Sequence, residues 1–405
     1  MDTTTKQNPL KKSIKYCSEA TVVKKENIII IVATNKVPQR TKLIIKRLQS
    51  TKKVLALCWA RKYTSNINDL PAIEFRARGI FSFAIRMCMW LVRAQYDRVI
   101  VSDFRILPLV ILVSKFKKAI IIYDRLEIPT VVAAEKIGNA TKIRHDNLLL
   151  LFERIESWYC KYVDTILTPP VELGVLAEEY SDKICILRNV PDPSIEKEPY
   201  EIIELDNCEY MIYAGTVSKN MGLEQYLDLT KRINDHSGRV VRLLLIGQLW
   251  GITEGELAEM IAKKELLDFV VYRSWVPYER VLSVIEKAKV GLALLDPQYE
   301  KFKFLKTGAS RKIFTYMLCG VPVISGEIGG DIVRKEKCGI VVDYNDVEAI
   351  YSRTEALLHD GSSRRMMGEN GRQAVLEKYN WQIESRKLGE IFQRYDGGNA
   401  IGIRQ

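Results

Sequence analysis

The chain has 405 residues, of which 47% are hydrophobic and 27% charged, a composition typical of a globular protein of about two domains. Its eight cysteines form no CxxC pair and it has only three histidines, so neither a disulfide scaffold nor a zinc site is indicated. The net charge of +11 is uneven: residues 1–190 carry 32 Lys and Arg against 18 Asp and Glu, or +14, and the rest carries 29 against 32, or −3.

Residues 1–26 are polar, lysine-rich and without periodicity, which predicts a flexible basic leader. They show no signal-peptide pattern, and the longest apolar runs, Ile28–Ala33 and Ile106–Val113, fall far short of the ~20 residues of a membrane span. We therefore expect a cytoplasmic protein, with at most a peripheral contact at the inner face of the plasma membrane.

Short apolar runs then alternate with segments of helical spacing, which predicts parallel strands covered by helices on both faces. The expected strands are 28–33, 54–59, 98–101, 119–123 and 164–168. The expected helices are 40–48, 80–92, 106–115 and 148–162. This pattern assigns an N-terminal Rossmann-like domain to residues 27–190.

Turn residues at 189–193 and an acidic stretch predict a linker at 191–208. The alternation then restarts and assigns a second Rossmann-like domain to residues 209–380. Its expected strands are 210–214, 240–246, 269–272, 290–294, 321–324 and 339–342. The fold class is thus α/β, with two βαβ lobes facing a central cleft. Ligands of such sheets bind beyond the carboxyl ends of the strands, so we expect the site in that cleft.

The loop Gly215-Thr-Val-Ser-Lys-Asn-Met-Gly222 is the first candidate for phosphate binding. Gly215 lets the backbone approach a ligand, the following helix directs N–H groups towards it, and Lys219 adds charge. The loop is not GxGxxG and lacks the acidic partner of dinucleotide sites, so NAD binding is not supported. A plain strand-to-helix turn is the alternative.

Two further loops carry the same chemistry. Ser310 is placed to cap a helix, while Arg311 and Lys312 occupy its first turn, where the helix dipole disfavours cations unless an anion is bound. Gly329 and Gly330 can expose consecutive N–H groups to an oxygen-rich ligand. Two solvated basic side chains would explain the first pattern equally well.

In the first lobe, Tyr123-Asp-Arg-Leu-Glu127 follows a strand end. This position places Asp124, Arg125 and Glu127 at the predicted cleft, where a carboxylate could orient an acceptor hydroxyl. An ordinary polar loop is the alternative.

Taken together, these motifs resemble bacterial glycosyltransferases of the two-lobed GT-B fold, in particular the retaining family 4 (glycosyl transferases group 1) of polysaccharide biosynthesis. The resemblance is clearest over residues 209–395, and is looser around Pro38-Gln-Arg40 and Tyr123-Asp124 in the first lobe. The motifs that carry it are Tyr213-Ala-Gly215, Arg273-Ser-Trp-Val-Pro277, Ser310-Arg-Lys-Ile-Phe-Thr-Tyr-Met-Leu-Cys-Gly-Val-Pro-Val-Ile324, Gly329-Gly330 and Tyr379-Asn-Trp381.

The resemblance implies that the second lobe binds a nucleotide diphosphate sugar, whose sugar passes with retention to a lipid-linked or glycan acceptor. Lys312, with Arg311 or Lys219, would stabilise the leaving diphosphate without a metal or other cofactor, and Glu127 and Asp124 would face the acceptor. The expected donor contacts are Gly215, Thr216, Lys219, Gly222, Gly247, Trp275, Val276, Ser310, Thr315, Gly329 and Gly330. The helix within 381–405 would cross back to the first lobe.

Three departures keep other functions open. Thr307 and Thr315 stand where the family has two glutamates, and Met221 stands where it has a basic residue. A non-catalytic binding or partner subunit is therefore one alternative, and a nucleotide-sugar epimerase of the same fold is another. The aromatic and basic motifs of nucleic-acid-binding modules are absent, so we expect no nucleic-acid partner.

The basic first lobe suggests an anionic partner, such as a membrane surface or a pyrophosphate-linked acceptor. Lysine-rich loops that only keep the protein soluble are the alternative. The apolar helix at 80–92, which contains Arg86, is expected either to pack on the first sheet or to enter a membrane interface.

Overall fold

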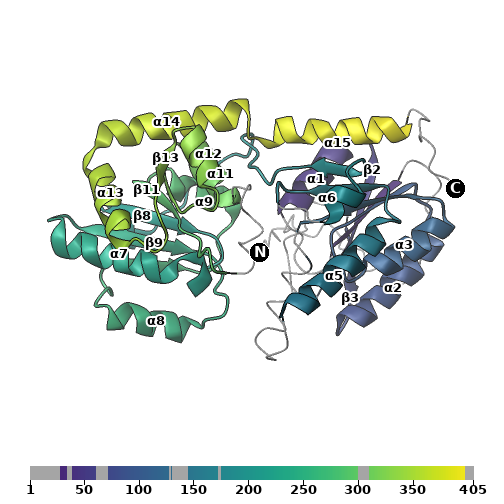
Figure 1. The fold of residues 1–405 in the computed structure, drawn as a ribbon, viewed down its shortest axis with the longest axis horizontal. Coiled ribbons are helices and arrows are strands. Elements are labelled where there is room, and N and C mark those ends of the chain that lie inside the picture. The colour runs from purple at the N-terminus through teal and green to yellow at the C-terminus, as the bar shows by residue number, and fades with distance from the viewer. Residues whose placement is uncertain are drawn as a thin grey trace, which may run out of the picture. The chain divides into compact units, whose positions relative to one another are not determined.

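A computed structural model describes residues 28–33, 39–60, 72–126, 129, 145–171, 175–299 and 310–396. They form two compact units, which Figure 1 draws as ribbons. The first takes in the described residues of 1–129, 151–167 and 175–185, and the second those of 130–150, 168–174 and 186–405.

The first unit is built on a sheet with the strand order β3-β2-β1-β4-β5-β6-β7. The strands are β1 (Ile28–Ala33), β2 (Lys53–Ala60), β3 (Ala72–Arg76), β4 (Arg98–Val101), β5 (Ile120–Asp124), β6 (Thr165–Thr168) and β7 (Ile184–Ile186). The helices are α1 (Gln39–Gln49), α2 (Ile80–Arg93), α3 (Leu107–Phe116), α5 (His145–Cys160) and α6 (Val175–Glu179). The predicted alternation of strands and helices is confirmed.

The centre of this sheet is apolar on both faces. Residues Ile29–Val32 of β1 are at most 1% exposed, and β1 pairs in parallel with both β2 and β4. Strands buried on both faces need a continuous aliphatic run, which is why β1 could be predicted. The edge strands β3 and β7 were not predicted, because they are short and half-buried, and such strands give a weak apolar signal.

The second unit repeats this architecture, with a parallel sheet of order β10-β9-β8-β11-β12-β13. The strands are β8 (Glu209–Ala214), β9 (Val241–Ile246), β10 (Val270–Arg273), β11 (Val290–Ala293), β12 (Val323–Ser325) and β13 (Gly339–Val341). The helices are α7 (Leu223–His236), α8 (Glu254–Lys263), α9 (Tyr278–Ile285), α11 (Arg311–Leu318), α12 (Gly330–Lys335), α13 (Val347–His359), α14 (Gly361–Glu377) and α15 (Trp381–Asp396). The 3-10 turns are η1 (Ile203–Leu205) and η2 (Lys219–Met221).

Successive residues of β8 show how this sheet is sandwiched. Tyr210 and Ile212 belong to one buried cluster, while Met211 and Tyr213 belong to another. Side chains of a strand alternate between its two faces, so each cluster is the core under one helical layer. Because the strands are parallel, their carboxyl ends lie along one edge, where ligands of such sheets bind.

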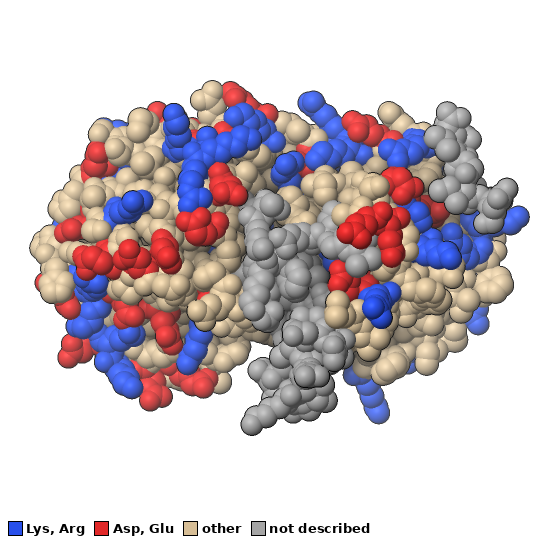
Figure 2. All heavy atoms as spheres, viewed as in Figure 1, with Lys and Arg blue, Asp and Glu red and all other residues tan. Residues whose placement is uncertain are grey.

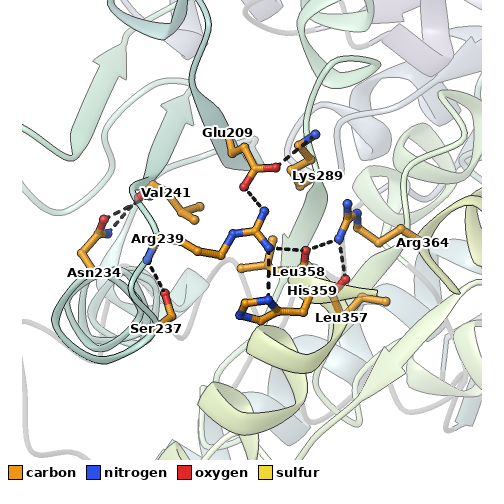
Figure 3. A network of polar contacts seen from close by, with 10 residues as sticks. All are labelled: Glu209, Asn234, Ser237, Arg239, Val241, Lys289, Leu357, Leu358, His359 and Arg364. Atoms are coloured by element: carbon orange, nitrogen blue, oxygen red, sulfur yellow. Dashed lines mark hydrogen bonds and ion pairs between the residues drawn. The ribbon is translucent and has the colours of Figure 1, made fainter. Parts of the chain in front are cut away.

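The opposite, amino-terminal edge is closed by the polar network of Figure 3. Arg239, just before β9, pairs with Glu209 at the start of β8 and donates to the carbonyl of Leu358 at 2.9 Å. Lys289, just before β11, lies 3.4 Å from Glu209. The guanidinium thus satisfies a carbonyl at the end of α13 and joins that helix to the sheet.

α15 directly follows α14 and contacts the segment before β8. Trp381 N donates to Pro191 O at 2.9 Å, and Glu384 pairs with Arg188 at 3.1 Å. The course of this helix towards the first lobe stays a prediction. No helix within the described ranges is long and apolar enough to cross a membrane.

Candidate functional site

Two glycines fix the loops at the centre of the second sheet's carboxyl edge. Gly215 follows β8 with a φ of +152°, and Gly247 follows β9 with a φ of +148°. A Cβ on Gly247 would lie 1.7 Å from the carbonyl oxygen of Gly215, so only glycine fits there. The loops continue side by side, because Val217 bridges to Leu249.

Lys312 of α11 folds over the first of these loops. Its Nζ donates to the Tyr213 hydroxyl at 2.9 Å and lies 4.3 Å from the centre of that ring. A Cβ on Gly215 would be 3.4 Å from Lys312 Cε, an ordinary van der Waals distance, so the lysine side chain lies directly beside the Gly215 backbone. The structure thus brings two separately predicted candidates, Gly215 and Lys312, into contact, while their binding of a donor phosphate stays a prediction.

The Lys312 ammonium is short of compensating charge. Among the described residues no carboxylate forms an ion pair with it, and burial lowers the pKa of Lys312 from 10.5 to about 7. The hydroxyl of Tyr213 accepts one hydrogen bond from the ammonium and donates its own hydrogen bond to the carbonyl of Thr216 at 2.6 Å. A partly desolvated cation with remaining donors is suited to an anionic ligand.

The start of α11 has the same character. Its first turn contains Arg311 and no acidic residue, and the Arg311 guanidinium stacks 4.5 Å from the centre of the Tyr278 ring. Ser310 occupies the N-cap position, but its hydroxyl makes no capping hydrogen bond, contrary to the expected cap. Its Oγ is buried and has no partner among the described protein atoms. A bound anion would satisfy both the hydroxyl and the helix dipole.

Thr315 lies one turn further along α11 and is 5% exposed. Its hydroxyl donates to the carbonyl of Arg311 at 3.0 Å and lies 3.3 Å from the Tyr278 hydroxyl. The side chain is therefore turned towards its own helix and Tyr278, and the expected contact with a ribose stays a prediction.

The remaining residues of the first loop are spread along its length. Thr216 and Lys219 are exposed, and Lys219 lies 4.0 Å from Glu224. Gly222 has a φ of +87°, and a Cβ there would lie 2.1 Å from the carbonyl of Leu294. Gly222 thus packs the loop against the end of β11, whereas the Lys219 amine is directed to a surface pair.

The other candidates follow β10 and β12, which are not adjacent in the sheet. Trp275, between β10 and α9, is 51% exposed, and Val276 packs partly on the core. Gly329 has a φ of +82° at the start of α12, and a Cβ on Gly330 would lie 2.8 Å from Val341. The carboxyl edge therefore combines an exposed indole with two glycine loops.

Three tyrosines hold this edge together, and sequence reasoning gave none of them a role. Tyr316 accepts from Ala214 N at 2.9 Å and donates to Leu292 O at 3.2 Å. Tyr226 bonds both the N–H and the carbonyl of Leu294, at 3.0 and 3.1 Å, and its ring packs on Tyr213. The tyrosine directly before Ala214-Gly215 was a visible signal, because Tyr213 closes a strand where a ligand loop begins.

The first-unit candidates lie in its interior. Asp124 is completely buried and forms a 2.6 Å ion pair with the equally buried Arg40. Burial raises the pKa of Asp124, against the opposing effect of Arg40. An acceptor could reach this carboxylate only by opening the pair, so its acceptor-facing role stays a prediction. Glu127 lies outside the described residues.

Arg125, 5% exposed, binds Glu156 with two hydrogen bonds, Nε to Oε1 at 2.7 Å and Nη2 to Oε2 at 3.0 Å. Tyr123 adds a third bond to the Glu156 carboxylate at 3.1 Å. This network fixes α5 against the end of β5. In the described ranges, no group of three or more His, Cys, Asp or Glu side chains could hold a metal ion.

Residues 195–374 match the family model described as glycosyl transferases group 1. The chain is 25% identical over 243 residues to the capsular polysaccharide biosynthesis glycosyltransferase CapM of Staphylococcus aureus, covering 59% of this chain and 60% of CapM. It is 39% identical over 75 residues to a GDP-mannose-dependent phosphatidylinositol monomannoside mannosyltransferase of Mycolicibacterium smegmatis, covering 18% of this chain and 20% of that protein. The matches thus span less than two thirds of these relatives.

Solved structures resemble the whole chain in fold. Anabaena HepE, in complex with UDP and glucose, superposes with a TM-score of 0.70 at 11% identity, over 91% of this chain and 100% of that one. A sucrose-phosphate synthase from Thermosynechococcus elongatus gives a TM-score of 0.70 at 14% identity, over 92% and 100%. These likenesses establish the two-unit GT-B fold.

Proposed function

We propose that this protein is a glycosyltransferase, because its residues 195–374 match the model of glycosyl transferases group 1 and its fold is GT-B. Its donor is a nucleotide diphosphate sugar, bound at the carboxyl edge of the second sheet. The observation that carries this proposal is Lys312, a half-buried cation that has no acidic partner among the described residues and lies against Gly215.

The reaction breaks the bond between the anomeric carbon of the sugar and the diphosphate oxygen. An acceptor hydroxyl oxygen forms the new bond to that carbon and gives its proton to the departing diphosphate, which also takes both electrons of the broken bond. Lys312, with Arg311 beside it, stabilises the charge that develops on the leaving group, and the Ser310 hydroxyl donates to it. Charge stabilisation of this kind needs cations that are in place before the reaction.

The loops after β10 and β12 bind the base and the sugar of the donor. Trp275 and Val276 line the pocket for the base, and Gly329 and Gly330 hold the sugar or a phosphate through backbone N–H groups. Relatives named for GDP-mannose and a neighbour bound to UDP support two different bases, so both belong in the test. The acceptor is a lipid-linked or glycan hydroxyl at the inner face of a membrane, and the transfer retains the anomeric configuration.

A non-catalytic binding subunit is the second candidate. It is favoured by Thr315, which has a neutral hydroxyl bonded to its own helix where the family places a carboxylate. Such a protein would bind the donor and release no product.

The test is turnover of UDP- and GDP-sugars labelled in the sugar, with membrane extract or polysaccharide as acceptor. Label in the organic or the polymeric fraction, together with released nucleoside diphosphate, supports transfer and assigns the acceptor class. Label in free sugar alone would contradict transfer, and binding without turnover would favour the non-catalytic subunit. The anomeric coupling of the product in an NMR spectrum decides retention.

A further inference from the structure

The outer face of α2 in the first unit is apolar where a helix covering a sheet would ordinarily be polar. Phe83, Ala84, Met87 and Leu91 face the sheet and are at most 6% exposed. The opposite face is formed by residues spaced one helical turn apart. They are Phe81, Ile85, Met89 and Val92, which are 83%, 60%, 47% and 59% exposed.

α3, which packs against α2, repeats the pattern. Leu107, Val110 and Ile111 are buried, while Leu109, Leu112 and Phe116 are 38%, 56% and 84% exposed. Of the 18 large hydrophobic side chains exposed among the described residues, seven lie on these two helices, so the exposure is concentrated. Single exposed side chains need no explanation, but a continuous patch does.

The charged residues of the two helices all have one sign. α2 and α3 contain Arg86, Arg93 and Lys115 and no acidic residue, and Lys117 and Lys118 follow α3 directly. The ends of the helices meet, because Lys117 Nζ donates to Ala94 O, the C-cap of α2, at 2.9 Å. Figure 2 shows the surface over these helices as mostly uncharged, with Lys and Arg at its margin.

The combination of exposed apolar side chains and cations on α2 and α3 indicates what binds to this face. A second copy of the chain pairing through the same face would bring the cations of both copies, Arg93 and Lys115 among them, into one interface, with no carboxylate on either helix to compensate. An apolar stripe flanked by cations is instead suited to a bilayer surface, where the aliphatic and aromatic groups enter the interface and the cations meet lipid phosphates.

We propose that α2 and α3 form a docking face that places the first unit on a membrane containing anionic lipid. This inference rests on the proposed function for its purpose: docking would bring a lipid-linked acceptor to the enzyme. The docking itself is independent of donor binding, since it uses residues of the first unit alone.

The experiment is sedimentation of the full chain with vesicles. One set contains phosphatidylcholine alone, and the other contains equal amounts of phosphatidylcholine and phosphatidylglycerol. We expect binding to the anionic vesicles that weakens as salt is raised, and little binding to the neutral ones. Absence of binding to anionic vesicles would overturn the proposal.

Variants locate the face. Phe81→Ser with Phe116→Ser removes an apolar group from each helix, and should lower the partition onto anionic vesicles by about tenfold or more. The matched control is Leu267→Ser with Leu376→Ser, two exposed leucines of the second unit (69% and 49%), which should leave partition unchanged. An equal loss in both pairs, or in neither, would contradict the assignment.

A charge reversal tests the contribution of the cations on α2 and α3 to membrane binding. Arg93→Glu with Lys115→Glu should weaken binding about tenfold or more, whereas reversal of the exposed Lys263 and Lys287 should have little effect. If instead the serine pair abolishes concentration-dependent self-association and leaves vesicle binding intact, the face is a dimer interface. All variants should keep the thermal shift given by the nucleotide sugar, so a failure of docking is distinguishable from a failure of the donor site.

Discussion

Replacing Lys312 by methionine should separate the ligand-binding role of this side chain from its role in stability. Methionine keeps much of the aliphatic length and removes the ammonium. A diphosphate charge at about 4 Å from Nζ would be attracted by ~4 kcal/mol at an effective dielectric constant near 20. Water that replaces the ammonium offsets part of this, so we expect affinity for the nucleotide sugar to fall by about 2–4 kcal/mol, roughly 30- to 1000-fold.

The same change should stabilise the protein without ligand. The pKa of Lys312 is about 7 in the folded chain, against an ordinary value of 10.5, so the unfolded state binds more protons between these pH values. Stability from this group therefore rises as pH increases from about 7 to 10.5. Near neutral pH, Lys312→Met should raise the free energy of unfolding by about 1 kcal/mol or more, and the gain should vanish at high pH.

Binding should depend on pH in the opposite sense. A bound diphosphate raises the pKa of Lys312, so binding takes up a proton above pH 7, and affinity should fall as pH rises from about 7 towards 9, by at most tenfold per unit. Calorimetric titration with the nucleotide sugar at several pH values measures this in wild type and Lys312→Met. The control is Lys263→Met, an exposed lysine. Undiminished affinity in Lys312→Met, or a lower melting temperature without ligand, would refute the reasoning.

Three other changes should have distinct effects. Gly247→Ala forces a Cβ to within 1.7 Å of the Gly215 carbonyl at a φ of +148° and should cost roughly 2 kcal/mol or more in urea unfolding; an unchanged midpoint would show that the loops do not touch. Glu156→Gln removes the charge that pairs with buried Arg125 and should lower the free energy of unfolding by about 3–5 kcal/mol. Glu178→Gln, at an exposed position, should leave that free energy almost unchanged. Similar losses of stability in the two variants would argue against a buried pair. EDTA should leave sugar transfer unaffected, because Lys312 and Arg311 supply the positive charge; loss of activity restored by a divalent cation would contradict this.

The alternation of strands and helices along the chain could be predicted in both units because the central strands are continuous aliphatic runs. Predicted helix ends lie close to the observed ones, as for α1, expected at 40–48 and found at Gln39–Gln49. The strands β3 and β7 were not predicted because half-buried edge positions tolerate polar residues, which weakens the apolar signal of a strand. Their pairing depends on neighbours that the local sequence does not specify.

Part of the candidate site could also be predicted from local sequence, and part depends on contacts between distant residues. The conflict between two cations and a helix N-terminus drew attention to Lys312 from local sequence alone. Its contact with Tyr213 could not be foreseen, because the two residues are 99 positions apart. They meet only when α11 packs on the sheet that contains β8. Likewise, Asp124 follows a strand end, as expected, but the turn of α1 that brings Arg40 onto it places the carboxylate in the interior.

The most direct test of the central claim is a thermal-shift comparison of UDP, GDP, ADP, CMP and the corresponding nucleotide sugars, with wild type and Lys312→Ala side by side. A ligand that binds only the folded state raises the melting temperature by mass action. The account predicts a shift with one diphosphate nucleotide and its sugar, lost in Lys312→Ala. No shift with any of them, or a shift of equal size in both proteins, would contradict a donor site built on Lys312.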